Sequence, residues 1–349
     1  MRSESVEMDG RRAAACRSNG AVENPSVFVH EMLDPSGDSL RWLESKGVRV
    51  DRGQPTWGED FFSEDELIER GRGHVALMGA SIHRITERVL TELPEVAFIS
   101  KYGIGVDSID VEVATRLGVL VTNTPIAENW DAVAEYTVAA MLALRKQLLF
   151  YTTERIRQGG WRTTDAWSDF LRHRVIGLVG FGRIGRGVAR RLQGWDCEFL
   201  VCDPYLAQDE VEHELVDLEN LLSRSDVISL HALATAETHH MIDARALELV
   251  KPNAVLINSA RGALVDTDAL YDALVDGRLA GAAMDAYESE PPAIDHPVFR
   301  LPNLIATPHS SAWVEETFEA IARTGAENLW EGLSGVRPPF AVNAEVLDR

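Results

Sequence analysis

The stretch Val175-Ile176-Gly177-Leu178-Val179-Gly180-Phe181-Gly182-Arg183-Ile184-Gly185 decides the fold, because an apolar run leads directly into three glycines spaced as GxGxxG. The uncharged run before Gly180 is typical of a strand buried in a parallel sheet. Apolar residues then recur at helical spacing as far as Leu192. A second apolar run, 198–202, ends at Asp203, eighteen residues after Gly185. The stretch therefore predicts a strand, a tight turn, a helix and a second strand, followed by an acidic residue.

A unit with these three glycines is typical of a dinucleotide-binding site. Gly180 permits the tight turn, Gly182 lets the main chain approach a pyrophosphate, and Gly185 lets the helix pack close to the strand. The helix begins near Arg183 and Ile184, where its free N–H groups and partial positive charge attract phosphates. We therefore expect these five residues to bind a dinucleotide. The alternative is a structural turn in another α/β fold.

The acidic residue Asp203 bears on the choice of cofactor. At the end of the second strand, its carboxylate can accept hydrogen bonds from the hydroxyls of the adenosine ribose. Its negative charge would also repel the 2′-phosphate of NADP. The sequence therefore predicts NAD as the cofactor, with Asp203 among its ligands. Rossmann-type hydrolases and methyltransferases are a further alternative, but they are expected to lack the catalytic side chains described below.

Composition and charge narrow the class of protein. The chain has 349 residues, 45% hydrophobic and 26% charged, which suits two domains of ordinary globular composition. Its net charge of −21 argues against nucleic acid or an anionic membrane as a partner, because both require clustered Lys and Arg. We find no apolar run of about 18 residues and no apolar signal core, so we expect no membrane partner. Cys16, Cys197 and Cys202 lack metal-ligand spacing, which favours free thiols, no metal and a cytoplasmic location.

Expected strands and helices alternate along the chain, which predicts an α/β fold of two Rossmann-like domains with parallel sheets. We expect a disordered tail at 1–24, a discontinuous substrate (catalytic) domain at 25–126 and 310–349, and an NAD-binding domain at 127–309. The expected strands are 27–32, 48–50, 75–78, 97–100, 119–122, 175–179, 198–202, 227–230, 254–259, 281–285 and 303–307. Apart from the helix after Gly182, the expected helices are 40–46, 64–70, 86–93, 111–117, 132–150, 218–222, 244–250, 266–276 and 311–333. A capping box at Ser63 and Glu66 marks the start of the second helix, and 132–150 is expected to join the two domains.

Polar segments follow three of the expected strands in the second domain. The strand 254–259 leads into Arg261, the strand 281–285 into Glu288 and Glu290, and the strand 303–307 into His309. In an open α/β sheet, ligands bind beyond the carboxyl ends of the strands. We therefore expect an arginine, a carboxylate and a histidine to converge on the nucleotide site, with Glu288 as a solvated loop acid.

Taken together, these motifs resemble the D-isomer-specific 2-hydroxyacid dehydrogenase family. The resemblance extends over roughly residues 27–343 and rests on the GFGRIG turn, Asp203-Pro204, Ser229-Leu230-His231, Asn258-Ser259-Ala260-Arg261-Gly262, Glu290-Pro291 and Thr307-Pro308-His309. It implies that Arg261, Glu290 and His309 are the catalytic residues. It also implies two Rossmann-like domains joined by a long helix, and a homodimer as the usual assembly.

The resemblance also implies ligand-binding residues by matched position. Further cofactor contacts are implied at Ala232, Thr238, Ser259, Ala260, Arg261, Asp285 and His309, with Asp285 matching the family's acid for the nicotinamide amide. Substrate-binding residues are implied at Tyr102, Gly103 and Ile104 of a glycine-rich loop, and at Arg261 and His309. The implied substrate is a small 2-oxo or 2-hydroxy acid, with glyoxylate and hydroxypyruvate as first candidates.

The residue types suit this chemistry. Arg261 offers a planar fork of donors to the oxygens of a 2-oxo acid. His309, when protonated, can donate to the carbonyl oxygen while a hydride reaches the adjacent carbon, and it takes the proton back in oxidation. Glu290 is expected to hydrogen-bond to the other imidazole nitrogen, to orient the ring and to raise its pKa. The N–H groups of Gly103 and Ile104 are expected to bind the substrate carboxylate.

Some residues leave alternatives open. Ala80 stands where phosphoglycerate-oxidising members carry a phosphate-binding arginine, which argues against 3-phosphoglycerate as the substrate, although Lys101, His83 or Arg84 could take the place of that arginine. Trp313 follows the last motif where many members have small residues, and it either narrows the substrate site or packs at a domain interface. His239 and His240 are adjacent and are expected to point to different faces. A function of another class is an NAD(H)-sensing interaction protein, because the C-terminal-binding corepressors share the fold and a segment like Glu288-Ser289-Glu290-Pro291.

Overall fold

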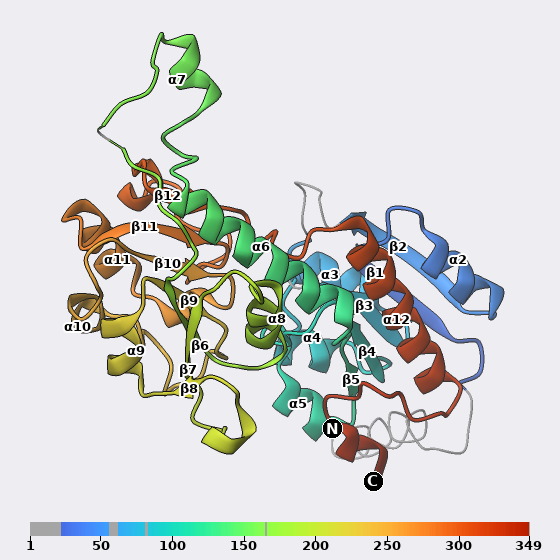
Figure 1. Cartoon of the computed structure of the whole chain (residues 1–349). Helices are drawn as coiled ribbons and strands as arrows, with labels where there is room; N and C mark the ends of the chain where they lie inside the picture. Colours follow the sequence, from blue (N-terminus) through green and yellow to red (C-terminus); the bar gives the residue numbers. More distant parts are fainter. Residues whose placement is uncertain (1–21, 56–61, 81–82, 165, 349) are drawn as a thin grey trace. The chain divides into compact units, whose positions relative to one another are not determined.

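The computed structural model describes residues 22–55, 62–80, 83–164 and 166–348, so most of the expected tail, 1–21, lies outside the described residues, and Cys16 with it. The chain divides into two compact units, which Figure 1 shows in sequence colours. Unit 1 comprises Met1–Asn129 and Val314–Arg349, and unit 2 comprises Trp130–Trp313. The chain therefore passes from one unit to the other within helix α6 (Ala127–Arg145) and again after Trp313.

Unit 1 is built on a five-stranded parallel sheet in the order β2-β1-β3-β4-β5. Val27 of β1 lies opposite Val50 of β2 on one side and Ala76 of β3 on the other. The strands are β1 (Ser26–Met32), β2 (Arg49–Pro55), β3 (Ala76–Gly79), β4 (Phe98–Lys101) and β5 (Leu120–Thr122). The helices are α2 (Asp38–Ser45), α3 (Glu64–Gly71), α4 (Glu87–Glu92), α5 (Val111–Arg116) and α12 (Glu315–Leu333), with a 3₁₀ turn η4 (Ala344–Asp348) near the end.

Helices cover both faces of this sheet, and burial on both faces explains why most residues of its central strands are apolar. On one face, Val27 packs in a cluster with Leu40 of α2 and Ile321 of α12. Figure 1 shows α12 alongside this part of the unit, where it lies against α2 and β4. On the other face, Phe28 packs in a cluster with Leu90 of α4 and residues of α3 and α5.

Strand β2 is longer than its sequence suggests. It runs to Pro55 rather than ending at Val50, because it pairs with β1 along its whole length at the edge of the sheet. Gly53 makes this close pairing possible, since a Cβ there would lie 2.7 Å from the carbonyl oxygen of Val29. The polar residues of β2 are tolerated because an edge strand is largely exposed.

The ends of unit 1 refine two further expectations. Helix α12 begins at Glu315 rather than Ser311, because the N–H of Ser311 donates to the carboxylate of Asp285 instead of entering the helix. At the other end, the N–H of Val22 donates to the carbonyl oxygen of Leu333 at 2.9 Å. The described residues that precede β1 are therefore bonded to the unit rather than free.

Unit 2 is built on a seven-stranded parallel sheet in the order β12-β11-β10-β9-β6-β7-β8. The strands are β6 (Val175–Val179), β7 (Glu198–Cys202), β8 (Glu214–Leu215), β9 (Val227–Leu230), β10 (Ala254–Asn258), β11 (Leu279–Met284) and β12 (Leu304–Ala306). Its elements besides α6 are α7 (Thr153–Arg157), α8 (Arg183–Arg191), α9 (Leu218–Arg224), α10 (Ala244–Glu248), α11 (Thr267–Val275), η1 (Gln208–Glu210), η2 (Gly262–Leu264) and η3 (Pro297–Arg300). Apolar clusters cover both faces, one with α6 and α8 and the other with α9, α10 and α11. Two parallel sheets with helices confirm the expected α/β fold class.

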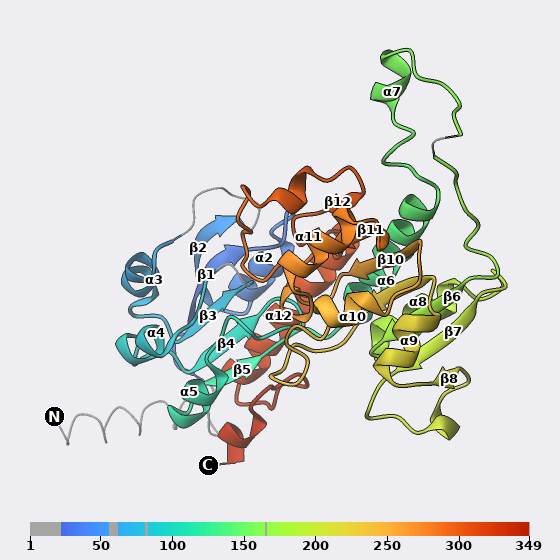
Figure 2. The ribbon, with the colours of Figure 1, turned by 90° about the vertical axis from the view of Figure 1, so that its left-hand side faces the viewer.

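The segment between α6 and β6 differs most from the expectation. Helix α6 ends at Arg145 rather than Phe150, because Gln147 has a φ of 55°, which lies in the left-handed region. Helix α7, which was not expected, follows in an excursion away from the strands of unit 2, and Figures 1 and 2 both show it at the tip. We call residues 146–164 and 166–174 the arm. Within the described part of the chain, every helix is too short or too polar to cross a bilayer.

Candidate active site

The three glycines of the GxGxxG turn lie where the main chain leaves β6 and enters α8. Gly180 has a φ of 89°, and a Cβ there would lie 2.7 Å from the carbonyl carbon of His231. A Cβ at Gly185 would lie 2.5 Å from the carbonyl oxygen of Gly180. A Cβ at Gly182, in contrast, would have no described atom within 4 Å apart from its chain neighbours and the adjacent helix backbone. The fold itself therefore requires Gly180 and Gly185, while Gly182 leaves space for a ligand beside the N-terminus of α8.

Asp203 lies at the end of β7, beside this turn. Its Oδ2 accepts the N–H of Phe181 at 2.9 Å, and its Oδ1 accepts the N–H of Tyr205 at 3.0 Å. Each oxygen retains a further lone pair, so the carboxylate can still accept ribose hydroxyls. In the first turn of α8, the guanidinium of Arg183 lies over the ring of Trp130, 4.6 Å from its centroid. The open space at the turn and the acidic residue next to it fit a dinucleotide.

Asn258 shapes the turn that carries Arg261 after β10. Its Oδ1 accepts the N–H of Ala260 at 3.1 Å, and its Nδ2 donates to the carbonyl oxygen of Arg261 at 2.9 Å. Nη1 of Arg261 donates to the carbonyl oxygen of Ala260 at 2.8 Å. Ser259 is fixed from another element, because its Oγ lies 3.0 Å from Oγ1 of Thr137 in α6. Asn258 belongs to a matched motif but was given no role there, although an amide at the end of a buried apolar strand is a usable signal.

Glu290 and His309 form a direct pair, with Oε2 of Glu290 2.7 Å from Nδ1 of His309. Oε1 of Glu290 accepts the N–H of Tyr287 at 3.1 Å, which orients the carboxylate. Because an ionised carboxylate can only accept, Nδ1 of His309 carries a proton in this pair. The other nitrogen, Nε2, is then the atom that can exchange a proton with a substrate.

The electrostatic surroundings favour the charged forms of both partners. The hydrogen bond to Glu290 raises the pKa of His309 above its usual value, while burial opposes the shift. The negative charge of Asp285 also raises this pKa, and the positive charge of Arg261 lowers it. Burial would raise the pKa of Glu290, but the hydrogen bond from His309 and the charge of Arg261 hold it below its usual value. Unit 2 therefore brings Arg261, Glu290 and His309 within electrostatic range of one another.

Asp285 lies fully buried at the end of β11 and anchors the turn that carries His309. Its Oδ1 accepts the hydroxyl of Thr307 at 2.6 Å and the N–H of Ser310 at 2.8 Å. Its Oδ2 accepts the N–H of Ser311 at 2.9 Å. A buried carboxylate needs such donors, because its charge is costly to remove from water. The implied contact of Asp285 with a nicotinamide amide stays a prediction.

Ala232 and Thr238 lie in the segment that follows β9. The hydroxyl of Thr238 donates to the carbonyl oxygen of Leu233 at 2.7 Å and accepts the N–H of Thr235 at 2.8 Å. This hydroxyl therefore closes a turn, and its contact with a cofactor stays a prediction. His231, directly before Ala232, has its pKa lowered to about 4 by burial. A neutral His231 suits a supporting role rather than proton transfer near neutral pH.

The glycine-rich loop expected to bind substrate follows β4 in unit 1. Tyr102 is buried, and Gly103 has a φ of 90°. The N–H of Gly103 donates to Oγ1 of Thr124 at 2.7 Å, so binding of a substrate carboxylate by this N–H, which stays a prediction, would require that contact to be exchanged. Nδ2 of Asn123 donates to the carbonyl oxygen of Ile104 at 2.7 Å, which fixes the next peptide. The N–H of Ile104 stays the predicted donor to substrate.

The structure tests two expectations about polar residues near α11, and one of them is wrong. His239 and His240 do not point to different faces, because their rings stack with centroids 4.0 Å apart and planes 28° apart. A φ of 50° at His240 turns the chain, so that adjacent side chains come together. Glu288 is exposed, as expected, and its Oε1 accepts the N–H and the hydroxyl of Thr267 at 3.0 and 2.9 Å.

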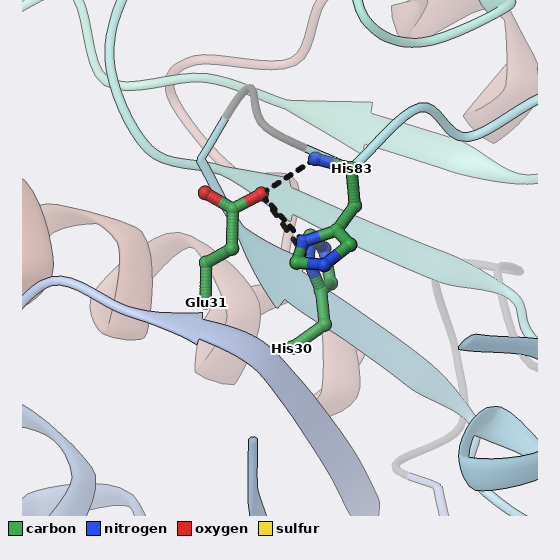
Figure 3. Close-up of side chains that lie close together, drawn as sticks. All are labelled: His30, Glu31 and His83. Atoms are coloured by element: carbon green, nitrogen blue, oxygen red, sulfur yellow. Dashed lines mark hydrogen bonds and ion pairs between the residues drawn. The ribbon is translucent and has the colours of Figure 1, made fainter. Parts of the chain in front are cut away.

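A buried polar cluster of His30, Glu31 and His83, for which the sequence offers no signal, lies in unit 1 (Figure 3). Their ligand atoms lie within 4.8 Å of one another, which a metal ion could bridge. Oε1 of Glu31 accepts the N–H of His83 at 2.9 Å and lies 3.0 Å from its Nδ1. Nε2 of His83 accepts the N–H of Phe62 at 2.9 Å, so Nδ1 must carry the proton. This tautomer makes His83 a donor to Glu31, and we therefore assign the cluster a structural role.

The glycine turn with Asp203 fits a dinucleotide, and the paired His309 and Glu290 place a proton-bearing imidazole in the same unit. A sequence model for the D-isomer specific 2-hydroxyacid dehydrogenase, NAD binding domain, matches residues 138–311. The chain is 38% identical to the glyoxylate reductase of Thermofilum pendens over 337 residues, which cover 93% of this chain and 96% of that one.

Solved structures agree with this similarity. The TT0316 protein from Thermus thermophilus matches with a TM-score of 0.84 and 34% identity, covering 91% of this chain and 99% of that one. D-Lactate dehydrogenase from Aquifex aeolicus, solved with NAD and lactic acid, matches with a TM-score of 0.75 and 30% identity, covering 88% and 94%. The chain belongs to the D-isomer specific 2-hydroxyacid dehydrogenase family, as its motifs predicted. It is an NAD-dependent 2-hydroxyacid oxidoreductase.

Proposed function

We propose that the enzyme interconverts a small 2-oxo acid and the D-2-hydroxy acid, with His309 as the general acid and base. The observation that carries this proposal is the 2.7 Å bond between His309 and Glu290. It holds a proton on Nδ1 and raises the pKa of the imidazole, so that a protonated His309 persists closer to neutral pH.

The proposed reduction requires one hydride and one proton. The hydride is the contribution that NADH would make when bound. As negative charge develops on the carbonyl oxygen of the substrate, Nε2–H of His309 donates its proton to that oxygen. His309 is then neutral, and Glu290 continues to accept the proton on Nδ1 and keeps the ring in place. In the oxidation, neutral Nε2 takes the proton from the hydroxyl.

Arg261 and the loop of unit 1 have proposed roles in substrate binding. The guanidinium of Arg261 offers paired donors to the carboxylate and carbonyl oxygens, and Asn258 fixes the turn from which it projects. We assign the N–H of Ile104 to the substrate carboxylate, with Tyr102 and Gly103 shaping the loop around it. For the cofactor, the glycine turn and the start of α8 would hold the pyrophosphate, and Asp203 the adenosine ribose.

The proposed substrate class is short, with glyoxylate and hydroxypyruvate first. A relative named glyoxylate reductase is 38% identical to this chain, which supports a small 2-oxo acid. Ala80 offers no cation for a phosphate, which argues against 3-phosphoglycerate. A screen of NADH consumption over short, branched and phosphorylated 2-oxo acids tests the substrate class. Preference for a phosphorylated acid would contradict it.

The test of the mechanism is His309→Ala, which should lower kcat by about two to four orders of magnitude. His239→Ala is the matched control, since that imidazole is exposed and its ring stacks on His240. Turnover that survives in His309→Ala would overturn the assignment of the general acid. Tight NADH binding without turnover across the whole panel would instead favour the NAD(H)-sensing alternative.

We also propose a homodimer in which the arm of one copy packs on the other. The arm exposes seven large apolar side chains: Leu148, Leu149, Tyr151, Ile156, Trp161, Trp167 and Phe170. The indoles of Trp161 and Trp167 are 71% and 75% exposed, and a gathering of this kind on one segment marks an interaction surface.

Charge favours a second copy as the partner of the arm. Residues 146–174 contain six Lys or Arg and three Asp or Glu, a net charge of +3. The rest of the chain therefore carries −24, because the whole chain carries −21. A basic, apolar arm complements an acidic body of the same chain, as a two-fold dimer requires.

We place the enzyme in the cytoplasm, which the free thiols of Cys197 and Cys202 support.

A further inference from the structure

Tyr136 of α6 is linked to the turn that carries His309 by a chain of hydrogen bonds. Its hydroxyl lies 2.6 Å from Oγ1 of Thr307, whose hydroxyl lies 2.6 Å from Oδ1 of Asp285. The carboxylate of Asp285 can only accept, so the single proton of the Thr307 hydroxyl points to it. The proton between the two hydroxyls must therefore come from Tyr136, which fixes the direction of the whole chain.

This chain ends on the anchor of the catalytic turn. Asp285 is fully buried, and it binds the residues on either side of His309: Thr307 before it, Ser310 and Ser311 after it. Thr307 is held a second time, since its carbonyl oxygen accepts the hydroxyl of Tyr287 at 2.9 Å. The main chain of the turn is therefore fixed independently of the imidazole.

His309 needs such an anchor because its backbone is unusual. Its φ of 50° lies in the left-handed region, which residues with a Cβ adopt only when their surroundings impose it. Its N–H donates to the carbonyl oxygen of Thr307 at 2.9 Å, so the strained peptide closes on the anchored residue. Glu290 orients the ring, whereas Asp285 and Thr307 determine where the ring is attached.

We propose that Tyr136 and Thr307 are positioning residues of the reaction, which hold His309 at its bonding distance from Glu290 through the buried carboxylate of Asp285. Neither side chain needs to touch substrate or cofactor for this role. The inference rests on the proposed function of His309. It assigns a role to a residue outside the matched motifs, because Tyr136 lies in the long helix α6 rather than at the end of a strand.

The test uses Tyr136→Phe and Thr307→Val in the full-length enzyme, because each removes a hydroxyl and retains most of the side-chain volume. We expect kcat for the best 2-oxo acid to fall by about tenfold in each, since a small misplacement of a catalytic group has effects of this order. The Kd for NADH should stay within about twofold. Thr307→Ser restores the hydroxyl and should recover most of the lost kcat. Tyr271→Phe is the control, because that partly buried tyrosine contacts His296 by its ring edge.

A second readout does not depend on turnover. The imidazole of His309 can be titrated by NMR in ¹³C-histidine-labelled enzyme, with its signal assigned by its loss in His309→Ala. Loosening the turn weakens the bond to Glu290, so both hydroxyl deletions should move this titration to lower pH than in the wild type. Unchanged kcat and an unchanged titration in Tyr136→Phe would overturn the inference. If instead the titration moves as expected but His309→Ala retains full turnover, the proposed function fails and the positioning role with it, whereas lost turnover in His309→Ala together with an unchanged Tyr136→Phe overturns the inference alone.

Discussion

Gly262 lies directly against the main chain of Tyr287. A Cβ at Gly262 would stand 1.9 Å from the carbonyl carbon of Tyr287 and 2.2 Å from its carbonyl oxygen. These two residues belong to different loops. Gly262 directly follows Arg261, whereas Tyr287 lies in the loop of Glu290 and donates its N–H to that carboxylate. The loop of the arginine and the loop of the carboxylate therefore meet backbone to backbone, and only glycine allows the contact.

We expect Gly262→Ala to be strongly destabilising, by about 3 kcal/mol or more, because rigid backbone rather than a flexible side chain blocks the new methyl group. Any folded fraction should also have a lower kcat, since the two loops are forced apart. Denaturant unfolding and steady-state kinetics measure the two effects. A variant as stable and active as the wild type would show that the loops do not meet in this way.

Gly182→Ala should separate folding from cofactor binding. The added Cβ would have no described atom within 4 Å apart from its chain neighbours and the adjacent helix backbone. It would therefore cause no clash, and the thermal midpoint of unfolding should stay close to that of the wild type. The same methyl group would occupy the space expected for the pyrophosphate, so the Kd for NADH should rise by about tenfold or more. Fluorescence titration with NADH measures this change, and an unchanged Kd would place the cofactor elsewhere.

The pH dependence of reduction should depend on Glu290. The raised pKa of His309 keeps the proton donor charged, so reduction is fastest below this pKa and falls as the pH rises through it. Glu290→Gln removes the charged hydrogen-bond acceptor and lowers the pKa of His309. The fall in kcat/KM should then begin at lower pH than in the wild type. A profile that does not move would show that Glu290 does not control the proton on His309.

Cofactor preference should depend on the charge of Asp203. Asp203→Ala removes the repulsion of a 2′-phosphate and should lower the preference for NADH over NADPH by about tenfold, on the scale of one lost charged hydrogen bond. It also removes the acceptor for the N–H of Phe181, which supports the glycine turn. Asp203→Asn is the matched variant, because it keeps an acceptor and removes only the charge. Equal preference in all three proteins would contradict the assignment of Asp203.

The arm should decide the oligomeric state. Replacing Trp161 and Trp167 by Ser removes the two most exposed indoles of the arm and should convert the proposed dimer to a monomer in light scattering after gel filtration. Trp195→Ser is the control, since Trp195 is 40% exposed and lies outside the arm. A double variant that stays dimeric would place the interface on another surface, and a monomeric wild type would contradict the dimer itself.

The sequence predicted the central strands well, because burial on both faces imposes uninterrupted apolar runs such as 175–179 and 254–257. It missed β8, which has only two residues, and α7, which has no buried residue. It also extended α6 too far, since nothing in the composition near Gln147 announces a left-handed backbone. Elements that are very short, or that bury no side chain, leave little hydrophobic pattern in the sequence.

Arg261, Glu290 and His309 could be proposed from sequence because each follows a strand whose carboxyl end is known from its apolar run. The supporting contacts could not. Tyr136 and Thr307 are 171 positions apart, and neither belongs to a pattern that relates one to the other. The stacking of His239 on His240 was also missed, because alternation of adjacent side chains holds only where the backbone is extended.

The buried cluster of unit 1 has an evolutionary consequence. A Cβ at Gly79 would lie 2.1 Å from Cε1 of His30, so the imidazole occupies the volume that any larger residue at position 79 would need. His30 is acceptable only while position 79 is glycine, whereas glycine at position 79 is acceptable with a smaller residue at position 30 as well. Homologous chains that carry a larger residue at position 79 should therefore lack the imidazole at position 30, and a lineage that lost the imidazole first would be free to acquire a side chain opposite it.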